Sequence, residues 1–304
     1  MSRVDGRQNI SGENAKEMLK CEGGLRLRGI GKKSHPGRPL VSIITVVYNG
    51  EKHIEQTIKS VLEQSYRPVE YIVVDGGSTD GTIDIIAKYE DRIDYWISEP
   101  DKGIADAMNK GIRFSNGDLI AHLHADDCYS DPSVISSVCS EYLRHPDALW
   151  VTGGLNIVDG GGNILQEIRV RKYSYRKLVR GNIILHPSTF VTQQAFQKAG
   201  VFNTEYRYAM DYDLWLRIGG IADPLTVDLQ VSCFRAHAGS RSITRSDLAY
   251  HESWRIRKRF LQGHPLLIAC HFLYYTACKK FVRMYYRNLL SGDGRNNDSD
   301  PDVS

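Results

Sequence analysis

The stretch "PLVSIITVVYN", residues 39–49, decides the fold that the sequence predicts. It is a β-branched apolar run that stops at Asn49-Gly50, which is typical of a buried strand followed by a turn. Apolar side chains then recur at helical spacing over residues 51–65, and a second apolar run occupies residues 69–75. A strand, a helix and a second strand at this spacing indicate a parallel sheet with right-handed crossovers.

The alternation of strands and helices continues through the first half of the chain. The patterns predict a strand near 94–98, a helix over 103–114, a strand over 119–123 and a helix over 132–144. After "LWVTGG" the pattern changes, because "IVDGGGNILQEI" predicts a hairpin across three glycines. We therefore expect an α/β protein whose first half is a nucleotide-type unit and whose second half is more mixed.

The composition is that of an ordinary globular protein, with 41% hydrophobic and 25% charged residues among 304. The 39 basic and 36 acidic residues leave a formal charge of +3, so the net charge does not indicate a nucleic-acid partner. The six cysteines form no CxxC pair and are interpreted as reduced thiols. Because the first twenty residues contain no apolar signal core, we expect a cytoplasmic protein.

The two ends of the chain differ in character from its centre. Residues 1–38 are rich in Gly, Lys, Arg and Ser and are predicted to be a flexible tail. Residues 243–292 are predicted to be a basic amphipathic helical extension, and residues 293–304 an acidic disordered tail. Within the extension, 264–290 is apolar, aromatic and basic at once, and no acidic residue stands between Glu252 and Asp293.

Three hypotheses account for the segment 264–290. The first is an interfacial helix on an anionic membrane surface, which would place the protein peripherally on the inner face of a membrane. The second is a helix that packs on the core and turns a basic face outward. The third is a weak spanning helix, although the densest apolar stretch falls short of the roughly 20 residues that a span requires.

Carboxylates follow the predicted strands at one edge of the sheet. The first strand ends at Tyr48 and Asn49, the second at Asp75, and "LIAHLHADD" brings Asp126 and Asp127 to the same edge, where ligands bind in parallel α/β sheets. Like charges at that distance raise each other's pKa unless a cation compensates, and hard oxygen ligands suit Mg²⁺ or Mn²⁺. We therefore hypothesise that Asp126 and Asp127 hold a divalent ion that in turn holds a diphosphate.

Each of these acids has a structural alternative. Asp126 or Asp127 would also serve as a helix cap, and Asp75 would also fix the glycine-rich turn that follows it. A second acidic cluster, Asp211 and Asp213, opens the amphipathic stretch "MDYDLWLRI". Either residue is explained by the helix macrodipole, or one of them is a general base, and the spacing alone leaves both readings open.

Several segments, in this order, resemble family 2 glycosyltransferases of the GT-A fold over roughly residues 40–240. They are "SIITVVYNGEKHIEQTIKSVLEQSY", "YIVVDGGSTDGT", "DKGIADAMNKGI", "HLHADD" and "MDYDLWLRI". The resemblance implies a Rossmann-like mixed central sheet flanked by helices, followed by the C-terminal helical extension. It also implies one GT-A domain over 39–242, with a nucleotide-binding half at 39–130 and an acceptor half at 131–242.

The resemblance implies roles for residues on the donor side. Asp75 contacts the base or ribose of the donor nucleotide, and Tyr48 packs on the nucleobase. Asp127 is the residue most expected to touch the metal, while Asp126 contacts the ribose or a metal-bound water. The implied cofactor is Mn²⁺ or Mg²⁺.

The resemblance also implies inverting transfer of a sugar from a nucleoside diphosphate to an acceptor hydroxyl. Asp211 is then the catalytic base and Asp213 is structural. Many members carry a second acid where this chain has Met210. The acceptor is a glycan or a lipid-linked molecule, in polysaccharide, glycan or glycolipid biosynthesis.

Five further donor contacts follow from the resemblance with less force. Lys102 and Asp106 lie in the segment expected beneath the donor sugar and diphosphate, and His186 lies in a turn near the diphosphate. Arg235 and His237 belong to "FRAHAGSRS", which resembles a mobile loop that closes over the donor phosphates.

Two other functions remain alternatives. A nucleotidyltransferase also places acids at strand ends, but it requires a glycine-rich phosphate loop after the first strand, and "VVYNGEKH" is not one. A non-catalytic sugar-nucleotide-binding module would keep Asp75 but would need neither Asp127 nor Asp211.

Overall fold

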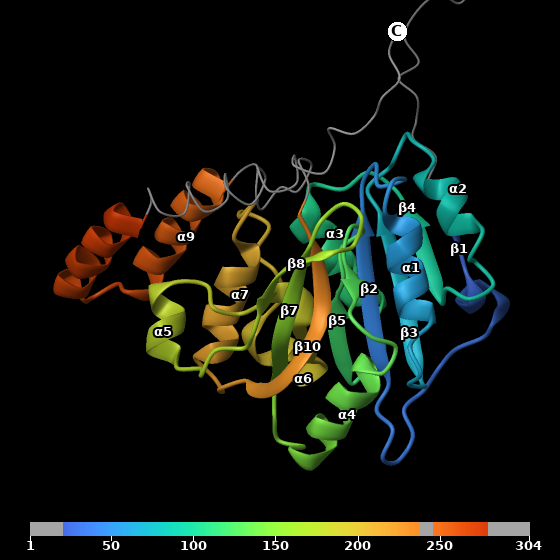
Figure 1. The fold of residues 1–304 in the computed structure, drawn as a ribbon, viewed down its shortest axis with the longest axis horizontal. Coiled ribbons are helices and arrows are strands. Elements are labelled where there is room, and N and C mark those ends of the chain that lie inside the picture. Colours follow the sequence, from blue (N-terminus) through green and yellow to red (C-terminus); the bar gives the residue numbers. More distant parts are fainter. Residues whose placement is uncertain (1–20, 237–245, 279–304) are drawn as a thin grey trace, which may run out of the picture.

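A single mixed sheet forms the centre of the computed structural model, which describes residues 21–236 and 246–278 (Figure 1). The spatial order of the strands is β1-β4-β3-β2-β5-β9-β7-β10-β6, and β8 pairs with β7 outside this path. The strands are β1 (Cys21–Gly23), β2 (Val41–Val47), β3 (Val69–Asp75), β4 (Tyr95–Ser98), β5 (Leu119–His122), β6 (Cys128–Tyr129), β7 (Trp150–Val158), β8 (Ile164–Ile168), β9 (Thr189–Thr192) and β10 (Leu225–Arg235).

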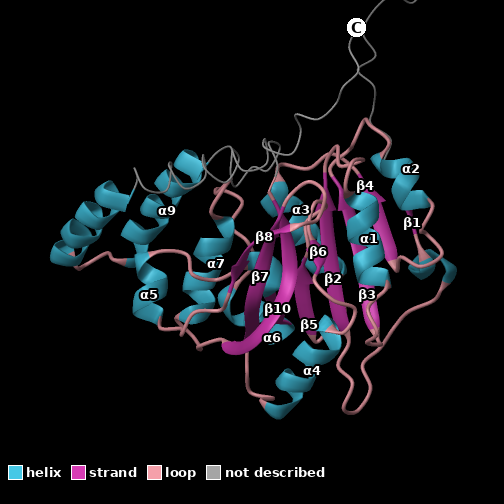
Figure 2. Ribbon diagram, in the orientation of Figure 1, coloured by secondary structure: helices cyan, strands magenta, loops and turns pink. Residues whose placement is uncertain are grey.

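Helices cover both faces of the sheet, as the cyan and magenta ribbons of Figure 2 show. The core on one face includes residues of α1, α2 and α4, and the core on the other face includes residues of α3, α6 and α7. The helices are α1 (Ile54–Leu62), α2 (Thr82–Ala87), α3 (Ile104–Phe114), α4 (Val134–Arg144), α5 (Tyr175–Arg180), α6 (Gln193–Ala199), α7 (Met210–Gly219) and α9 (Ser246–Phe260), with short 3-10 turns η1 (Leu25–Arg28) and η2 (His186–Ser188).

The β-branched run that predicts the first strand forms β2, near the middle of the sheet, and every residue of β2 is buried. Successive side chains of a strand point to opposite faces. Ile43 accordingly packs in the same core as Ile58 of α1, while Ile44 packs in the same core as Met108 of α3. Burial on both sides explains why this strand is apolar throughout and not alternating.

The nucleotide-type half of the sheet is parallel, as predicted. β2 pairs in parallel with β3 and with β5, and β3 pairs in parallel with β4. The second half is mixed, because β9 runs antiparallel to β5 and β7. The predicted glycine hairpin is confirmed by the antiparallel pairing of β7 with β8, in which Val158 lies opposite Ile164. The α/β fold with a mixed central sheet and C-terminal helices is thus as expected.

The prediction of a flexible tail up to residue 38 is wrong for residues 21–38. Strand β1 pairs antiparallel with β4, with Cys21 opposite Ser98, and so covers the edge of the sheet. Lys32 donates a hydrogen bond to Val69 O and forms an ion pair of 2.7 Å with Asp94. An edge strand is stabilised by a partner elsewhere in the chain, so its own composition does not reveal it. Residues 1–20 lie outside the described part.

The predicted C-terminal extension is helical over its described part. Helix α9 contacts α5 and α7, and a further helical segment follows from residue 265 and is described to residue 278. In Figure 1, α9 and α5 lie at one end of the molecule and α2 and β1 at the other. Within the described ranges, no helix combines the length and the apolar character that a membrane crossing requires. Residues 279–304, including the predicted acidic tail, lie outside the description.

Candidate active site

A cavity of about 790 Å³ opens beyond the carboxyl ends of the parallel strands. Its lining brings together five of the predicted site residues, which are separated in the sequence by up to about half of the chain. These are Tyr48, Asp126, Asp127, His186 and Asp211. Tyr48 is 57% exposed and therefore offers its ring to a ligand. The cavity thus lies at the edge of the sheet where the sequence predicts the ligand site.

Asp127 is a buried carboxylate that the protein satisfies only in part. Its exposed fraction is 1%, and its Oδ1 accepts a hydrogen bond of 3.3 Å from the backbone N–H of Arg235. Its Oδ2 has no partner among the residues that the structure describes. Burial raises the pKa of Asp127 well above its usual value, and the neighbouring charge of Asp126 adds to the rise.

The carboxylates of Asp126 and Asp127 fit a divalent cation. An orphaned, buried carboxylate oxygen beside a second acid is costly unless a cation neutralises it. No group of three His, Cys, Asp or Glu side chains suited to a metal occurs in the described ranges. Mg²⁺ and Mn²⁺ do not require one, because they use one or two carboxylates together with waters and substrate phosphates. Thr57 fixes the acidic loop, since its hydroxyl donates to the carbonyl oxygens of Ala125 and Asp127.

Asp211 lies in the first turn of α7 and lines the cavity. The side-chain amide of Asn182 donates a hydrogen bond of 2.8 Å to its Oδ2. Burial raises the pKa of Asp211 to about 6, although that hydrogen bond and the backbone N–H of Tyr212 lower it in part. A carboxylate with a pKa near neutrality that faces a cavity is suited to accept a proton.

The loop before Asp211 is held by a residue of the C-terminal extension, Glu252 of α9. Its carboxylate accepts hydrogen bonds from three consecutive backbone N–H groups, of Arg207 at 3.0 Å, Tyr208 at 2.7 Å and Ala209 at 2.7 Å. These N–H groups lie just before α7, which begins at Met210, so the carboxylate holds the loop that leads into Asp211. The sequence patterns did not reveal Glu252, because its partners are backbone groups distant in the chain.

Asp213 has a structural role, as the sequence interpretation holds. It is fully buried and forms an ion pair of 2.9 Å with Arg217 on the next turn of α7. Arg217 also donates to the carbonyl oxygens of Ala199, the last residue of α6, and of Val201, which follows it. This pair fastens α7 to α6 and does not line the cavity.

Asp75, which is predicted to contact the donor nucleotide, is engaged by the turn that follows β3. The Asp75 carboxylate is fully buried and accepts hydrogen bonds from the backbone N–H groups of Gly77 and Ser78 and from the hydroxyls of Ser78 and Ser98. Four hydrogen bonds use the acceptor capacity of a carboxylate. Asp75 is also absent from the cavity lining. The structural alternative considered for this residue is therefore the one that the coordinates support.

A different acid, Asp101, occupies the space beside that turn. A β-carbon on Gly76 would come within 2.5 Å of Asp101 Oδ2 and 3.5 Å of the Tyr48 ring. Asp101 lines the cavity, as Gly76 and Tyr48 do. The absence of a side chain at residue 76 thus lets a carboxylate from the loop before α3 reach the end of the cavity where Tyr48 lies. The close approach of two segments is not visible in their sequences.

Two predicted donor contacts from the same loop are not in the cavity lining. Lys102 is exposed, and its backbone N–H donates to Asp106 Oδ2 at 3.1 Å. Asp106 lies in the first turn of α3 and 4.0 Å from Lys110. The neighbouring residues of the loop line the cavity instead, and among them are Asp101 and Gly103. Asp106 therefore stabilises the start of α3.

Arg235, which is predicted to contact the donor phosphates, is engaged by groups of the protein in this structure. Its side chain is 4% exposed, and its guanidinium donates to the carbonyl oxygens of Asp126, Asp159 and Gly160 and to Gln56 Oε1. Arg235 therefore holds the acidic loop in place from behind. The other residue predicted from this loop, His237, lies outside the described residues.

His186 lines the cavity as a neutral imidazole. Its ring lies 5.1 Å from the ring of His124 and 5.8 Å from that of His122, both nearly parallel to it. Burial lowers the pKa of His186 well below its usual value, and the charges of His124 and His122 lower it further. Both ring nitrogens are buried, and neither has a hydrogen-bond partner within the described ranges.

Comparison with known proteins agrees with this fold. The family model "Glycosyl transferase family 2" matches residues 42–200, and the chain therefore belongs to glycosyl transferase family 2 and is a glycosyltransferase. It is 34% identical over 196 residues to an uncharacterized glycosyltransferase of Mycobacterium tuberculosis, a match that covers 62% of this chain and 72% of the relative. It is 31% identical over 193 residues to the hyaluronan synthase of Pasteurella multocida, covering 62% of this chain but only 20% of that enzyme.

Solved structures show the same GT-A-like fold. S. aureus TarS 1–349 in complex with UDP-GlcNAc superimposes with a TM-score of 0.61 at 16% identity, covering 86% of this chain and 76% of that one. The mannosyltransferase PcManGT from Pyrobaculum calidifontis, in complex with GDP-Man and Mn²⁺, superimposes with a TM-score of 0.59 at 18% identity, covering 90% and 81%.

Proposed function

We propose that this protein is an inverting glycosyltransferase that moves a sugar from a nucleoside-diphosphate sugar to an acceptor hydroxyl, with Asp211 as the catalytic base. One observation carries the proposal. A single cavity contains both an acidic pair with an unpartnered buried oxygen, at Asp127, and a separate carboxylate with a pKa of about 6, at Asp211. A non-catalytic nucleotide-binding module would not require the second carboxylate.

The proposed reaction is a single displacement. The acceptor oxygen attacks the anomeric carbon, the bond from that carbon to the diphosphate oxygen breaks, and Asp211 takes the proton of the acceptor hydroxyl. Asn182 holds Asp211 Oδ2 in place for this transfer. Asp126 and Asp127 would hold Mg²⁺ or Mn²⁺, which supplies charge neutralisation for the departing diphosphate. No covalent enzyme intermediate is needed.

The donor is proposed to lie with its nucleobase at Tyr48 and its diphosphate toward the acidic pair. Asp101 and Tyr48 would face the base, a carboxylate and an exposed ring that line the same end of the cavity. Two cationic side chains of the lining, Lys52 and Arg207, are exposed and suited to phosphate oxygens. TarS and PcManGT support this assignment, because they are recorded with UDP-GlcNAc and with GDP-Man and Mn²⁺.

A thermal-shift screen with UDP, GDP and dTDP and their sugars, each with and without Mn²⁺, tests the proposal. We expect one nucleotide series to raise the melting temperature in a Mn²⁺-dependent manner. The same donor is then incubated with a panel of glycan and lipid-linked acceptors, and the release of nucleoside diphosphate is measured. Stabilisation without transfer to any acceptor would favour a binding module, and release of pyrophosphate from a nucleoside triphosphate would favour a nucleotidyltransferase.

The C-terminal extension is proposed to meet an anionic membrane surface, where a lipid-linked acceptor would be found. The helical segment 265–278 exposes several large apolar side chains, namely Leu266, Leu267, Phe272 and Leu273. Arg255 and Lys258 are exposed on the neighbouring α9. Truncation at residue 255 should abolish co-sedimentation with phosphatidylglycerol vesicles that the full chain shows. Equal sedimentation of both forms would reject this part of the proposal.

A further inference from the structure

Two cysteines stand opposite each other where β6 and β10 pair beside the acidic loop. The strands are antiparallel, with Cys128 opposite Cys233 and Tyr129 opposite Ser232. Both cysteines are free and half-buried, and the two thiols are joined by a hydrogen bond. Residues directly opposite in an antiparallel pair have α-carbons about 4.5–5.5 Å apart, within the range of about 4.4–6.8 Å that a disulfide bridges. The backbone therefore already has the separation that a bond between the two sulfurs requires.

Asn156 of β7 holds the sulfur of Cys233 from the other side. It lies opposite Cys233 in the parallel pairing of β7 with β10, and its side chain hydrogen-bonds the Cys233 sulfur. Asn156 Oδ1 is buried without a partner among the described residues, so the amide N–H is the group that donates to the sulfur. Cys233 thus lies between Cys128 and a buried amide. A side chain that is already held in one orientation loses little further freedom when a bond forms.

Other cysteines of the chain are placed differently. Cys139 is buried and hydrogen-bonds the hydroxyl of Tyr66, which is not a disulfide partner. Cys21 belongs to β1, at the opposite end of the strand order from β6. Cys270 is exposed on the helical segment 265–278. The contact between Cys128 and Cys233 is therefore a specific feature of the junction between β6 and β10.

The two cysteines are close in sequence to the groups that hold the acidic loop. Cys128 follows Asp127 directly, and Cys233 stands two residues before Arg235. The backbone N–H of Arg235 donates to Asp127 Oδ1 at 3.3 Å, and its guanidinium donates to the carbonyl oxygen of Asp126 at 3.2 Å. Both hydrogen bonds are longer than the usual distance of about 2.9–3.0 Å. A covalent bond between the two sulfurs would fasten the acidic loop to the strand that supports it.

Strand β6 is short and lies at the edge of the sheet. It consists of Cys128 and Tyr129, and it forms the end of the strand order next to β10. The pairing continues at Ser130, whose backbone N–H donates to Val231 O at 3.1 Å. A short edge strand opens more readily than a central strand, because fewer contacts hold it. A disulfide would prevent this opening and would leave the side chains that line the cavity unchanged.

We propose that Cys128 and Cys233 are a redox modification site, at which hydrogen peroxide forms a reversible disulfide that fastens the acidic loop to β10. One thiol breaks the O–O bond of the peroxide and becomes a sulfenic acid, and the first water leaves. The second thiol attacks that sulfur, the S–S bond forms, and a second water leaves with the remaining thiol proton. The two sulfurs lose two electrons, which the peroxide takes up, and a dithiol reverses the reaction by exchange. The inference goes beyond the proposed function and does not depend on it.

Peptide mapping of the full-length chain after treatment with hydrogen peroxide tests the bond. We expect a cross-linked pair of peptides that contains Cys128 and Cys233, and we expect dithiothreitol to release it. Because the bond closes a loop of about 100 residues, the oxidised chain should melt about 5 °C or more above the reduced chain. Hydrogen exchange at the amides of residues 127–129 should become slower in the oxidised chain. These measurements use the unmodified protein, so they do not depend on whether a variant folds.

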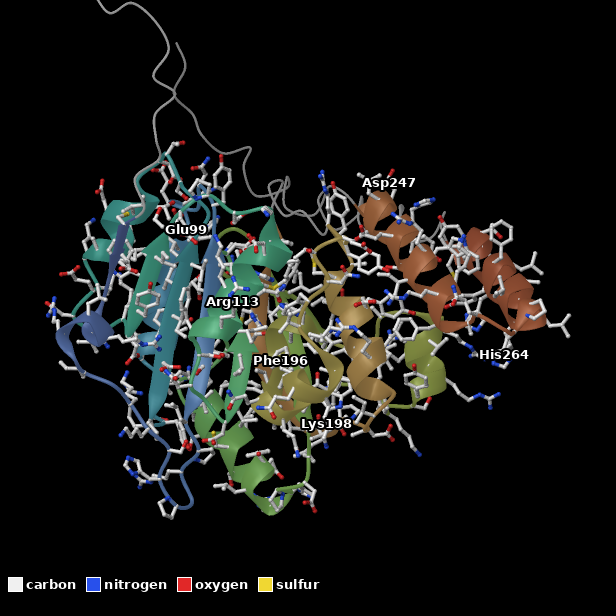
Figure 3. All side chains as sticks on the ribbon, turned by 180° about the vertical axis from the view of Figure 1, so that it is seen from behind. Glu99, Arg113, Phe196, Lys198, Asp247 and His264 are labelled. Carbon is white, nitrogen blue, oxygen red and sulfur yellow. The ribbon has the colours of Figure 1, made fainter. Side chains whose placement is uncertain are left out.

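Single substitutions then assign the two sulfurs. Cys128→Ser and Cys233→Ser keep the approximate size of the side chain and remove one sulfur each. Each variant should lose the cross-linked peptides and the peroxide-dependent rise in melting temperature. Cys270→Ser is the matched control and should keep both, because it removes an exposed cysteine from a distant segment. That segment follows His264, which lies on the opposite side of the molecule from Glu99 in Figure 3.

Three outcomes would overturn the inference. The first is a peroxide-treated chain in which Cys128 and Cys233 are free or carry sulfinic acid, with no link between them. The second is a link that leaves both the melting temperature and the exchange at residues 127–129 unchanged. The third is an equal rise in melting temperature in Cys128→Ser. Mn²⁺-dependent stabilisation by nucleotides is measured on the reduced chain, so that a failed disulfide is distinguished from a failure of the glycosyltransferase assignment.

Discussion

Two regions of the molecule differ in the sign of the charge that each leaves unbalanced. One is the strand ends that line the cavity, and the other is the pair of helices α5 and α9. In the first region, Asp126 and Asp127 are adjacent, and one buried carboxylate oxygen has no described partner. In the second, Arg257 is buried with two unpartnered nitrogens, and no acid follows Glu252 until residue 293. The first region lines the cavity and therefore suits a cation, whereas Arg257 is not part of that lining.

The same comparison separates charges that serve the fold from charges that serve a ligand. Asp75 and Arg235 are as deeply buried as Asp127, but each is engaged by several groups of the protein. Asp213 also has one carboxylate oxygen without a described partner, but its charge is balanced by the ion pair with Arg217. Neither burial nor an unpartnered oxygen alone therefore marks a functional residue; what marks it is a buried charge that the described protein leaves unbalanced beside a cavity.

The largest effect is expected from Asp211→Asn, which removes the proton acceptor and keeps its shape. Transfer to the acceptor should fall by about 10²–10⁴-fold, the usual contribution of a positioned general base. Donor binding should remain, because Asp211 is not proposed to contact the nucleotide. Turnover is measured by release of nucleoside diphosphate, and donor binding by thermal shift.

Asp213→Asn is the matched control for that variant, two residues away on the same helix. It breaks the pair with Arg217 and should lower the melting temperature, with much less loss of turnover in the folded fraction. A normal turnover rate of Asp211→Asn would contradict its role as the base. Equal behaviour of the two variants would show that Asp211 and Asp213 do not differ in function.

A smaller effect, on nucleotide affinity, is expected from Asp127→Asn at the proposed cation site. Mn²⁺-dependent nucleotide affinity should weaken by about 10–100-fold, while the protein without metal should become more stable because a buried charge is removed. Calorimetry with and without Mn²⁺ measures the first effect, and chemical denaturation in a chelator measures the second. Unchanged affinity in the presence of Mn²⁺ would remove the metal assignment.

The pH dependence of turnover and of stability gives a further test of the role of Asp211. Since its pKa in the folded protein is about 6, turnover should fall about tenfold for each pH unit below that value. The folded pKa is raised above the unfolded value near 4, so the ionised carboxylate opposes folding. The unmodified protein should therefore lose stability relative to Asp211→Asn as the pH rises from about 4 to about 6. A parallel pH dependence of unfolding in both proteins would contradict this.

The smallest effect is expected from Glu252→Gln, which tests whether α9 holds the loop of residues 207–209. An amide accepts the three backbone N–H groups less well than a carboxylate, and the free energy of unfolding should fall by about 1–2 kcal/mol. The exposed Glu63→Gln provides a control with no change. A hydrogen-exchange measurement should show faster exchange of residues 207–209 in Glu252→Gln only. Equal protection of these amides in both variants would show that Glu252 does not hold this loop.

The sequence predicts what depends on neighbours in the chain. The run of β2 and the spacing of α1 and β3 follow from local patterns, and so do the positions of Asp127 and Asp211 at element ends. Other features depend on partners that are distant in the chain. The Arg235 guanidinium contacts Gln56, which lies 179 residues away, and β1 is ordered by pairing with β4. Asp101 reaches the cavity only because another segment leaves space at Gly76.

The hold of Glu252 on residues 207–209 has a consequence for synthesis of the chain. The carboxylate comes from a residue 43 positions after Ala209, so the loop that leads into Asp211 lacks these hydrogen bonds until α9 has left the ribosome. The sheet and the acidic pair, in contrast, are built from residues up to 235. A nascent chain that has folded its sheet would therefore complete the proposed cation site before the loop beside Asp211 is held in place.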